Sequence, residues 1–198
     1  MPTNKDNTGN FFALLFRMKN IGRWGLMQCT RIENLSEHSL ETAFLTHALA
    51  VIGVTKFSKN YDPQKLAAVA MYHDMSEVLT GDIPTPVKYY NDDIRDAYKQ
   101  IEEAANNRLL SLMDDDFYTY YNQLFASLTS EERQLIKSAD KLSAHIKCLN
   151  ELKAGNGEFE TAAVSTLKLL KEDSSQELSY FMENYLEVFS KELDKVTI

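Results

Sequence analysis

Apolar residues recur at helical spacing along nearly the whole chain. The first long stretch begins at Asn34 or Ser36, either of which can cap a helix, and runs through about Val54 with apolar side chains on almost every side. Such a helix is expected at the centre of a core. A second helical stretch opens at Asp62-Pro63 and is closed by Gly81, since proline fits the first turn of a helix and glycine fits its end.

The next part of the chain shows the same helical period between clear breaks. Pro84 and Pro86 enforce an irregular loop, after which Asn91 can cap a third helix. Three aspartates at 114–116 mark another break, and the aromatic segment 117–125 is expected to form a short helix. These breaks separate elements that must fold back on one another.

Two further cap patterns precede the last apolar runs. Thr129 with Glu132 has the spacing of a capping box for a helix that ends near Gly155, and Ser174 with Glu177 starts the last helix in the same way. No segment alternates as a strand does, so the pattern predicts an all-α bundle of roughly eight to ten helices. The residues expected to face the core are Ile94, Ala97, Tyr98, Ile101, Ala105, Leu109, Leu112, Leu135, Ala139, Leu142, Ile146, Leu149, Leu178, Phe181, Met182, Tyr185 and Phe189.

Ionisable groups interrupt the apolar stripe of the second helical stretch. In a continuous helix over 66–77, His73 and Glu77 fall on the same face as the buried positions, and Asp74 lies beside them. A buried carboxylate is tolerated only when it is paired, hydrogen-bonded or bound to a metal. The segment therefore predicts a polar site inside the protein.

Composition and charge limit the class of protein. With 44% hydrophobic and 25% charged residues, the 198-residue chain is expected to fold as one domain, residues 1–198, without help from disulfides. The formal net charge of -8 disfavours nucleic acid and anionic membrane as partners, because no Lys/Arg cluster offsets it. A small anionic substrate would need a cation or an arginine in its pocket.

The cysteines and the N-terminal residues indicate the cellular compartment of the protein. Cys29 and Cys148 have no metal-ligand spacing and are expected to be unbridged thiols in a reducing compartment. Residues 1–6 do not resemble a signal peptide, and no apolar run is expected to reach the ~20 residues that span a bilayer. We expect a cytoplasmic protein.

Besides His73 and Asp74, two more residues are candidate metal ligands. They are His38 in the first turn of the apolar helix and Asp140 on the helix after Thr129. Each alone has a plainer reading: His38 can be satisfied by a backbone carbonyl, and Asp140 can face water. Together, two imidazoles and two carboxylates at or beside buried faces suit a divalent ion such as Mn, Fe, Co, Ni or Zn.

The two remaining histidines are not needed for this site. His47 lies on the face of Leu40, Phe44 and Val51 and is expected to pack in the core, while His145 lies on a different side of its helix from Asp140. So few histidines favour one metal ion over a two-metal centre.

The order His38, His73-Asp74, Asp140 is similar to the H…HD…D signature of the HD-domain metal-dependent phosphohydrolases, an all-α superfamily of helical bundles. Within it, the chain resembles the bacterial 5'-deoxynucleotidases, which hydrolyse deoxyribonucleoside 5'-monophosphates to the nucleoside and phosphate. The likeness runs from about Phe11 to the C-terminal helix. The stretches that carry it are Arg23-Trp24, Asn34–Leu40 and Met71–Tyr89.

The resemblance implies a role for each of these residues. His38, His73, Asp74 and Asp140 would hold one divalent ion, for which cobalt or manganese fits the resemblance and zinc is compatible with the ligands. Glu77 and Asp82 would act in catalysis, with Glu77 as general acid or base. The residues implied to contact the substrate are Arg23, Trp24, His38, Asp82, Ile83, Pro84, Thr85 and Asp140.

Some of these residues also have plainer readings. Asp82 can be a turn aspartate that bonds its own backbone, Trp24 a core anchor, Arg23 a solvated charge and Glu77 an exposed helix residue. In the family the tryptophan is implied to crowd the 2' position of the sugar, so that deoxyribose is favoured over ribose. A homodimer is implied as well.

Two competing functions remain open at this point. Hydrolysis of guanosine tetraphosphate is disfavoured because enzymes with that activity carry an HDxxED motif. Here Val78 follows Glu77 at the position of the second acid of that motif. A non-catalytic HD module that only binds a nucleotide is disfavoured because Glu77 and Asp82 would have no use there.

Overall fold

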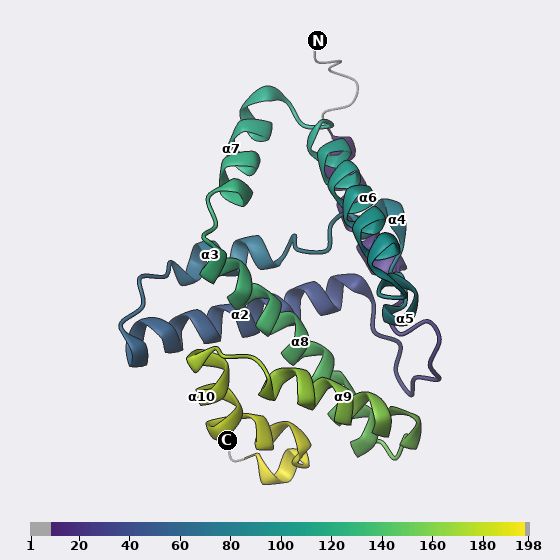
Figure 1. Cartoon of the computed structure of the whole chain (residues 1–198), viewed down its shortest axis with the longest axis vertical. Coiled ribbons are helices and arrows are strands. Elements are labelled where there is room, and N and C mark those ends of the chain that lie inside the picture. Colours follow the sequence, from purple (N-terminus) through teal and green to yellow (C-terminus); the bar gives the residue numbers. More distant parts are fainter. Residues whose placement is uncertain (1–8, 197–198) are drawn as a thin grey trace. The chain divides into compact units, whose positions relative to one another are not determined.

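The structure is a computed structural model that describes residues 9–196, and this part of the chain is built from helices without a strand (Figure 1). The N-terminal residues 1–6, on which the signal-peptide expectation rests, lie outside the described residues. The all-α prediction is confirmed, with ten α-helices in the described part. The α-helices are α1 (Asn10–Leu15), α2 (Leu35–Phe57), α3 (Pro63–Ala70), α4 (Glu77–Thr80), α5 (Thr85–Lys88), α6 (Asp92–Leu110), α7 (Asp115–Ala126), α8 (Ser130–Lys153), α9 (Glu160–Lys171) and α10 (Gln176–Asn184). The 3-10 helices are η2 (Phe16–Asn20), η3 (Gly157–Phe159), η4 (Leu186–Ser190) and η5 (Leu193–Lys195).

The described chain divides into two compact units. The first comprises residues 9–27, 32–39 and 72–127, and the second comprises residues 28–31, 40–71 and 128–196. The prediction of a single domain stays a prediction.

In the first unit, α4 and α5 pack on α6, and a compact apolar cluster joins α1 to the end of α6. The buried members of this cluster are Phe11, Met75, Leu109, Leu110 and Met113. Tyr72 packs on its edge, with its ring 5.5 Å from that of Tyr121. Met75 belongs to this cluster and directly follows Asp74, so its packing holds the C-terminal end of the segment that carries His73 and Asp74.

In the second unit, α8 is the central element and packs against α3, α9, η3 and η4. The capping box of Thr129 and Glu132 is formed as predicted, with both reciprocal hydrogen bonds present. Most of the predicted stripe of α8 is buried: Leu135, Ala139, Leu142 and Ile146 are all less than a tenth exposed, and Leu149 is half-buried. The periodicity along α8 was therefore a sound guide to its packing.

The helix expected between Asp62-Pro63 and Gly81 is interrupted, which corrects the prediction of one continuous element. α3 ends at Ala70, and α4 begins only at Glu77. Between them the backbone makes tight turns, in which the N–H of Met75 donates to the carbonyl of Tyr72 and that of Glu77 to that of Asp74. Helical spacing therefore does not place His73 on the stripe of α3.

Smaller corrections concern caps and faces. The last helix is capped by Ser175, whose side chain accepts from the N–H of Leu178, and not by Ser174. Ile94, Ala97 and Ile101 are exposed on α6, although Tyr98, Ala105 and Leu109 are buried as expected. Tyr185, which was also expected to face the core, is 45% exposed. Only part of the predicted apolar face of α6 is covered.

The helix α2 is apolar on nearly all sides, but one of its faces is exposed. Leu40, Phe44 and Val51 are 49%, 65% and 37% exposed, so the prediction that His47 packs in the core on this face is wrong. α2 is also long and apolar enough to cross a membrane by length and composition, which corrects the expectation that no run is so long. Core helices meet the same criterion, and α2 buries polar Thr42 and Thr46 completely.

Candidate metal and substrate site

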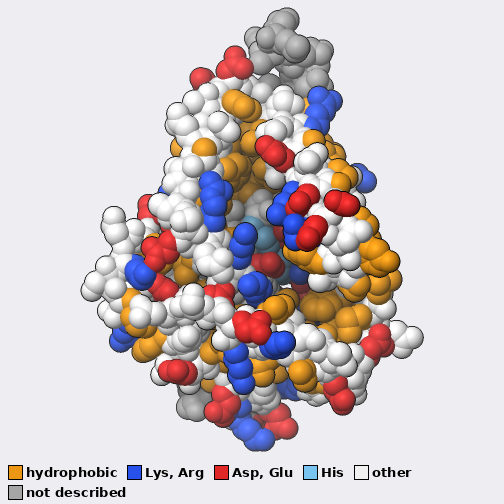
Figure 2. All heavy atoms as spheres, in the orientation of Figure 1, with side chains coloured by type: hydrophobic (Ala, Val, Ile, Leu, Met, Phe, Trp, Pro, Cys, Tyr) orange, Lys and Arg blue, Asp and Glu red, His pale blue; other side chains and the backbone are white. Residues whose placement is uncertain are grey.

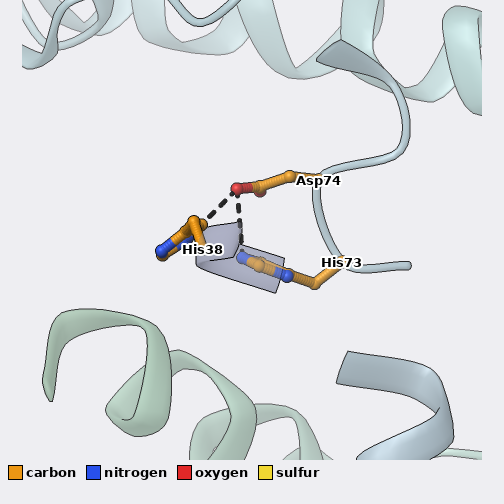
Figure 3. Close-up of side chains that lie close together, drawn as sticks. All are labelled: His38, His73 and Asp74. Carbon is orange, nitrogen blue, oxygen red and sulfur yellow. Dashed lines mark ion pairs between the residues drawn. The ribbon is translucent and has the colours of Figure 1, made fainter. Parts of the chain in front are cut away.

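The side chains of His38, His73 and Asp74 converge in the first unit (Figure 3). Oδ2 of Asp74 lies 3.0 Å from Nε2 of His73 and 3.5 Å from Nε2 of His38. The two imidazole rings are 5.1 Å apart between centroids. One donor atom from each residue lies within 4.8 Å of the others, a geometry in which all three can bind one ion.

Local sequence fixes where these side chains start. Asn34 caps α2 by accepting from the N–H groups of Ser36 and Glu37, so that His38 stands in the first turn. Its side chain is fully buried, whereas His73 and Asp74 are half-buried. His73 and Asp74 come from the tight turns between α3 and α4, and this irregular backbone lets neighbouring residues aim at one point.

The two histidines favour the ionised form of Asp74. Burial alone would raise the pKa of this carboxyl, but its electrostatic interactions with the imidazoles of His73 and His38 outweigh burial and hold the pKa well below its usual range. An ionised carboxylate beside two imidazoles is a donor set that suits a borderline divalent cation. The residues present therefore fit the metal that the sequence predicts.

Arg23 reaches the same cluster. Its Nη1 lies 3.5 Å from Oδ2 of Asp74, and its Nε lies 2.9 Å from Oε1 of Glu33. Its guanidinium is thus placed beside the candidate ligands, where it can meet an anionic group in a forked geometry.

Trp24 has an unusual backbone. Its φ is +62°, in the left-handed region that a bulky residue rarely adopts, and its carbonyl accepts from the N–H of Met27 in a tight turn. The side chain is half-buried. Strain of this kind persists only where the surroundings enforce it and is common in ligand-binding segments.

Glu77 begins α4 and is buried, with 5% of its surface exposed. Burial, together with the negative charges of Asp74 and Asp82, raises the pKa of Glu77 to about 8, although Arg23 and Lys88 act in the opposite direction. Among the described residues its Oε2 atom has no hydrogen-bond partner. The prediction that Glu77 is a buried acid and not a solvated helix residue is confirmed.

The Pro-rich loop follows α4. Asp82, Ile83 and Pro84 are half-buried, and Thr85 is exposed at the start of α5. Asp82 is near enough to Glu77 for its charge to raise the Glu77 pKa. The loop thus borders the buried acid.

The fourth predicted ligand belongs to the other unit. Asp140 is half-buried on α8, in the second unit, whereas the three converging residues belong to the first. Its role as a ligand stays a prediction. His145 is also on α8, where its Nδ1 lies 2.9 Å from Oγ1 of Thr166, and burial lowers its pKa.

Two residues near the cluster were not singled out from the sequence. Glu33 is a buried carboxylate that contacts Arg23, and Lys88 is a half-buried cation that pairs with Glu102 at 2.6 Å. Neither lies on a predicted apolar stripe, so periodicity gave no signal. The polar run before the cap of α2 is the only sequence hint for Glu33.

Solved structures define the fold. An HD-domain phosphohydrolase from Listeria innocua superposes with a TM-score of 0.79 at 22% identity, over 93% of this chain and 90% of that one. A cyanophage S-2L HD phosphohydrolase, solved with dA and one catalytic Zn²⁺ ion, superposes with a TM-score of 0.62 at 19% identity, over 88% of this chain and 95% of that one. The fold is that of the HD-domain phosphohydrolases.

Sequence comparison narrows the class. A 5'-deoxynucleotidase of Pectobacterium atrosepticum is 48% identical over 193 residues, which are 96% of this chain and 97% of that protein. One from Vibrio atlanticus is 47% identical over 190 residues, covering 95% of this chain and 98% of that protein. The chain belongs to the 5'-deoxynucleotidase YfbR-like family, whose model matches residues 10–189. The family predicted from the sequence is thereby confirmed.

Proposed function

We propose that the protein is a metal-dependent 5'-deoxynucleotidase, a phosphoric monoester hydrolase that releases phosphate from deoxyribonucleoside 5'-monophosphates. The observation that carries this proposal is the convergence of His38, His73 and Asp74 within 4.8 Å, in a chain of the 5'-deoxynucleotidase YfbR-like family. The names of the full-length relatives support the same activity.

We assign one divalent ion, cobalt, manganese or zinc, to His38, His73 and Asp74, with Asp140 as the fourth ligand. Neutral imidazole and ionised carboxylate are the forms that bind such ions, and aspartate is ordinarily ionised at neutral pH. When bound, the ion supplies Lewis acidity and makes hydroxide available near neutral pH.

Glu77 supplies the proton in this proposal. With a pKa raised to about 8, its carboxyl is protonated at neutral pH and can donate this proton to the 5'-oxygen of the leaving group. The deoxynucleoside then departs with a 5'-hydroxyl. Asp82 contributes to catalysis through this pKa, because its negative charge disfavours ionisation of Glu77.

Substrate binding is assigned to residues around the cluster. The guanidinium of Arg23 would receive the phosphate, and Trp24, whose strained backbone fixes its position, would pack against the sugar at its 2' position. The other residues assigned to substrate contact are His38, Asp82, Ile83, Pro84, Thr85 and Asp140.

The surface favours a small substrate. Lys and Arg side chains are interspersed with Asp and Glu on the face drawn in Figure 2, and the net charge is -8. Such a surface offers little to a nucleic acid or an anionic membrane. We place the protein in the cytoplasm as a homodimer, for which the exposed apolar face of α2 is a suitable contact.

A phosphate-release panel tests this function. Metal-free protein is reconstituted with Co²⁺, Mn²⁺ or Zn²⁺ and offered the deoxyribose and ribose monophosphates of each base. We expect release from deoxyribonucleotides that needs the metal, and much weaker release from ribonucleotides. Equal turnover of both sugars would remove the assigned selectivity, and turnover that survives complete chelation would contradict the metal-dependent mechanism.

A further inference from the structure

A buried carboxylate outside the assigned ligand set connects two parts of the site. Glu33 is 7% exposed, and its Oε1 atom lies 2.9 Å from Nε of Arg23 and 3.6 Å from Nδ1 of His38. One oxygen atom therefore faces both the candidate phosphate-binding guanidinium and a candidate metal ligand. Burying a carboxylate costs free energy unless oppositely charged or hydrogen-bonding groups lie next to it.

The backbone holds Glu33 in this place. An antiparallel bridge joins Gly22 to Asn34, and the N–H of Arg23 donates to the carbonyl of Glu33 at 2.9 Å. The N–H of Leu35 donates to the carbonyl of Ile21, also at 2.9 Å. Arg23 and Glu33 are thus paired across the bridge by backbone and side chain, so their contact does not depend on two flexible side chains meeting by chance.

The carboxylate of Glu33 lies on the Nδ1 side of the His38 ring. Nδ1 of His38 faces Glu33, while Nε2 lies 3.5 Å from Oδ2 of Asp74, on the side of the other donors. A carboxylate beside one ring nitrogen favours the proton on that nitrogen and leaves the other free to bind a metal. Partners of this kind raise the basicity of the ligating nitrogen.

Glu33 also places Arg23. Because Nε is held at Glu33, the outer end of the guanidinium extends towards Asp74, with Nη1 3.5 Å from Oδ2. The negative charge of Glu33 offsets the positive charge of the guanidinium, which lies beside the candidate cation site. Without this offset, the arginine would repel the metal and could draw Asp74 away from it.

We propose that Glu33 is a positioning residue that supports metal binding through His38 and phosphate binding through Arg23. The inference rests on the proposed function, since it takes His38 as a ligand and Arg23 as a phosphate contact. The inference goes beyond that function in assigning metal binding by His38 and phosphate binding by Arg23 to the support of one carboxylate, that of Glu33.

Glu33→Gln tests the inference, because it keeps the size and an acceptor but removes the charge. The readout is the dissociation constant for Mn²⁺, measured by calorimetric titration of metal-free protein. We expect it to rise about 10–100-fold. Thermal unfolding of the metal-free variant shows that it is folded, and Glu131→Gln, which removes an exposed partner of Lys59 on α8, is the matched control with unchanged affinity.

Arg23→Gln separates the two roles. We expect it to raise KM for a deoxyribonucleoside monophosphate without weakening Mn²⁺ binding, whereas Glu33→Gln changes both. In the double variant Arg23→Gln/Glu33→Gln, assayed at saturating Mn²⁺ so that every protein carries its metal, the KM should match that of Arg23→Gln alone, because Glu33 acts on phosphate only through Arg23. Additive effects on KM would overturn this part of the inference.

The outcomes distinguish the inference from the function beneath it. If wild type binds Mn²⁺, Asp74→Asn does not, and folded Glu33→Gln binds it as tightly as wild type, Glu33 has no positioning role while the metal site stands. If wild type and Asp74→Asn bind Mn²⁺ equally, the metal site fails and the inference with it. Should Glu33→Gln not fold, Glu33→Asp replaces it: its shorter carboxylate cannot reach both partners, and wild-type affinity in that variant overturns the inference.

Discussion

Nε2 of His73 lies 3.0 Å from Oδ2 of Asp74, the next residue along the chain. Successive side chains of a continuous α-helix point about 100° apart and do not face each other. The tight turns between α3 and α4 remove this restriction, so both residues direct a donor atom to the same point. The break in the helix therefore lets neighbouring residues of the candidate metal site converge.

Metal binding should stabilise the protein through His73. A ligand at one hundred times its dissociation constant adds about 2.7 kcal/mol to the free energy of unfolding, which raises Tm by several degrees. We expect Mn²⁺ to raise the Tm of wild type and of His47→Gln, which alters an exposed histidine. His73→Gln should show no such rise, and a rise equal to that of wild type would exclude His73 as a ligand.

The raised pKa of Glu77 predicts how stability depends on pH. Between pH 4.5, the ordinary pKa, and about 8, the folded protein keeps a proton on Glu77 that the unfolded chain has lost. The stabilisation from this carboxyl is therefore complete below pH 4.5 and is lost as pH rises to about 8, by up to roughly 5 kcal/mol.

Glu77→Gln removes this titration. The free energy of unfolding of metal-free protein, measured by urea denaturation at several pH values, should fall from pH 5 to pH 8 more steeply in wild type than in Glu77→Gln, with a difference in slope of about 1.4 kcal/mol per pH unit. Parallel pH profiles for the two proteins would show that Glu77 titrates normally.

Much of this arrangement follows from local sequence. The caps at Asn34, Asn91 and Thr129 were predicted because each cap needs only a side chain and a backbone N–H three residues away. The stripe of α8 was predicted because a helix repeats its buried face regularly. Both depend on neighbours in the chain.

What sequence could not give depends on contacts between distant residues. The helix expected through His73 ends at Ala70, and Met75 beyond the break packs in the apolar cluster with Phe11 and Leu109, a contact that no spacing rule reveals. The role of Glu33 depends on a bridge between Gly22 and Asn34, twelve positions apart, in a chain without strands in its described part. The exposed face of α2 looked like core because composition does not show which sides are covered.

The second unit contains a buried ion pair that fixes the segment 28–31. Glu151 is 1% exposed and accepts from Nζ of Lys147 at 2.5 Å, from Nδ2 of Asn156 at 2.9 Å, and from both the N–H and the hydroxyl of Thr30. Burial opposes ionisation, but these donors hold the pKa of Glu151 well below its usual range.

Glu151→Ala should lower the free energy of unfolding by about 3–5 kcal/mol, because it leaves the Lys147 cation buried without its partner. Glu158→Ala is the control, since exposed Glu158 accepts from the N–H of Gln28 in the same segment at 3.0 Å and should cost less than about 1 kcal/mol. Urea denaturation of both variants checks this, and equal costs would contradict the assigned importance of the buried pair.

Sugar selectivity should depend on Trp24. If the indole crowds the 2' position, Trp24→Ala opens space for a hydroxyl, and the ratio of kcat/KM for dAMP over AMP should fall by about tenfold or more. Tyr120→Ala, which removes an exposed aromatic side chain on α7 outside the assigned site, is the control and should change the ratio little. An unchanged ratio in folded Trp24→Ala would assign the discrimination to another residue.

The exposed face of α2 predicts the oligomeric state. Phe44 is 65% exposed at the centre of the stripe formed by Leu40, Phe44 and Val51. We expect the mass from light scattering to be that of a dimer for wild type and of a monomer for Phe44→Glu, because a charge at the centre of an apolar contact is not compensated. Lys99→Glu, on α6, should leave the dimer intact. A dimer that persists in Phe44→Glu would place the contact elsewhere.

The most direct test of the account is the number of divalent ions bound by each chain. Metal-free wild type and Asp74→Asn are dialysed against Mn²⁺ at equal concentration, bound metal is measured by elemental analysis, and phosphate release from dAMP is recorded on the same samples. We predict one ion per chain and hydrolysis in wild type, and neither in Asp74→Asn. One ion per chain in both proteins, with equal hydrolysis, would contradict the assignment of catalysis to an ion held by His38, His73 and Asp74.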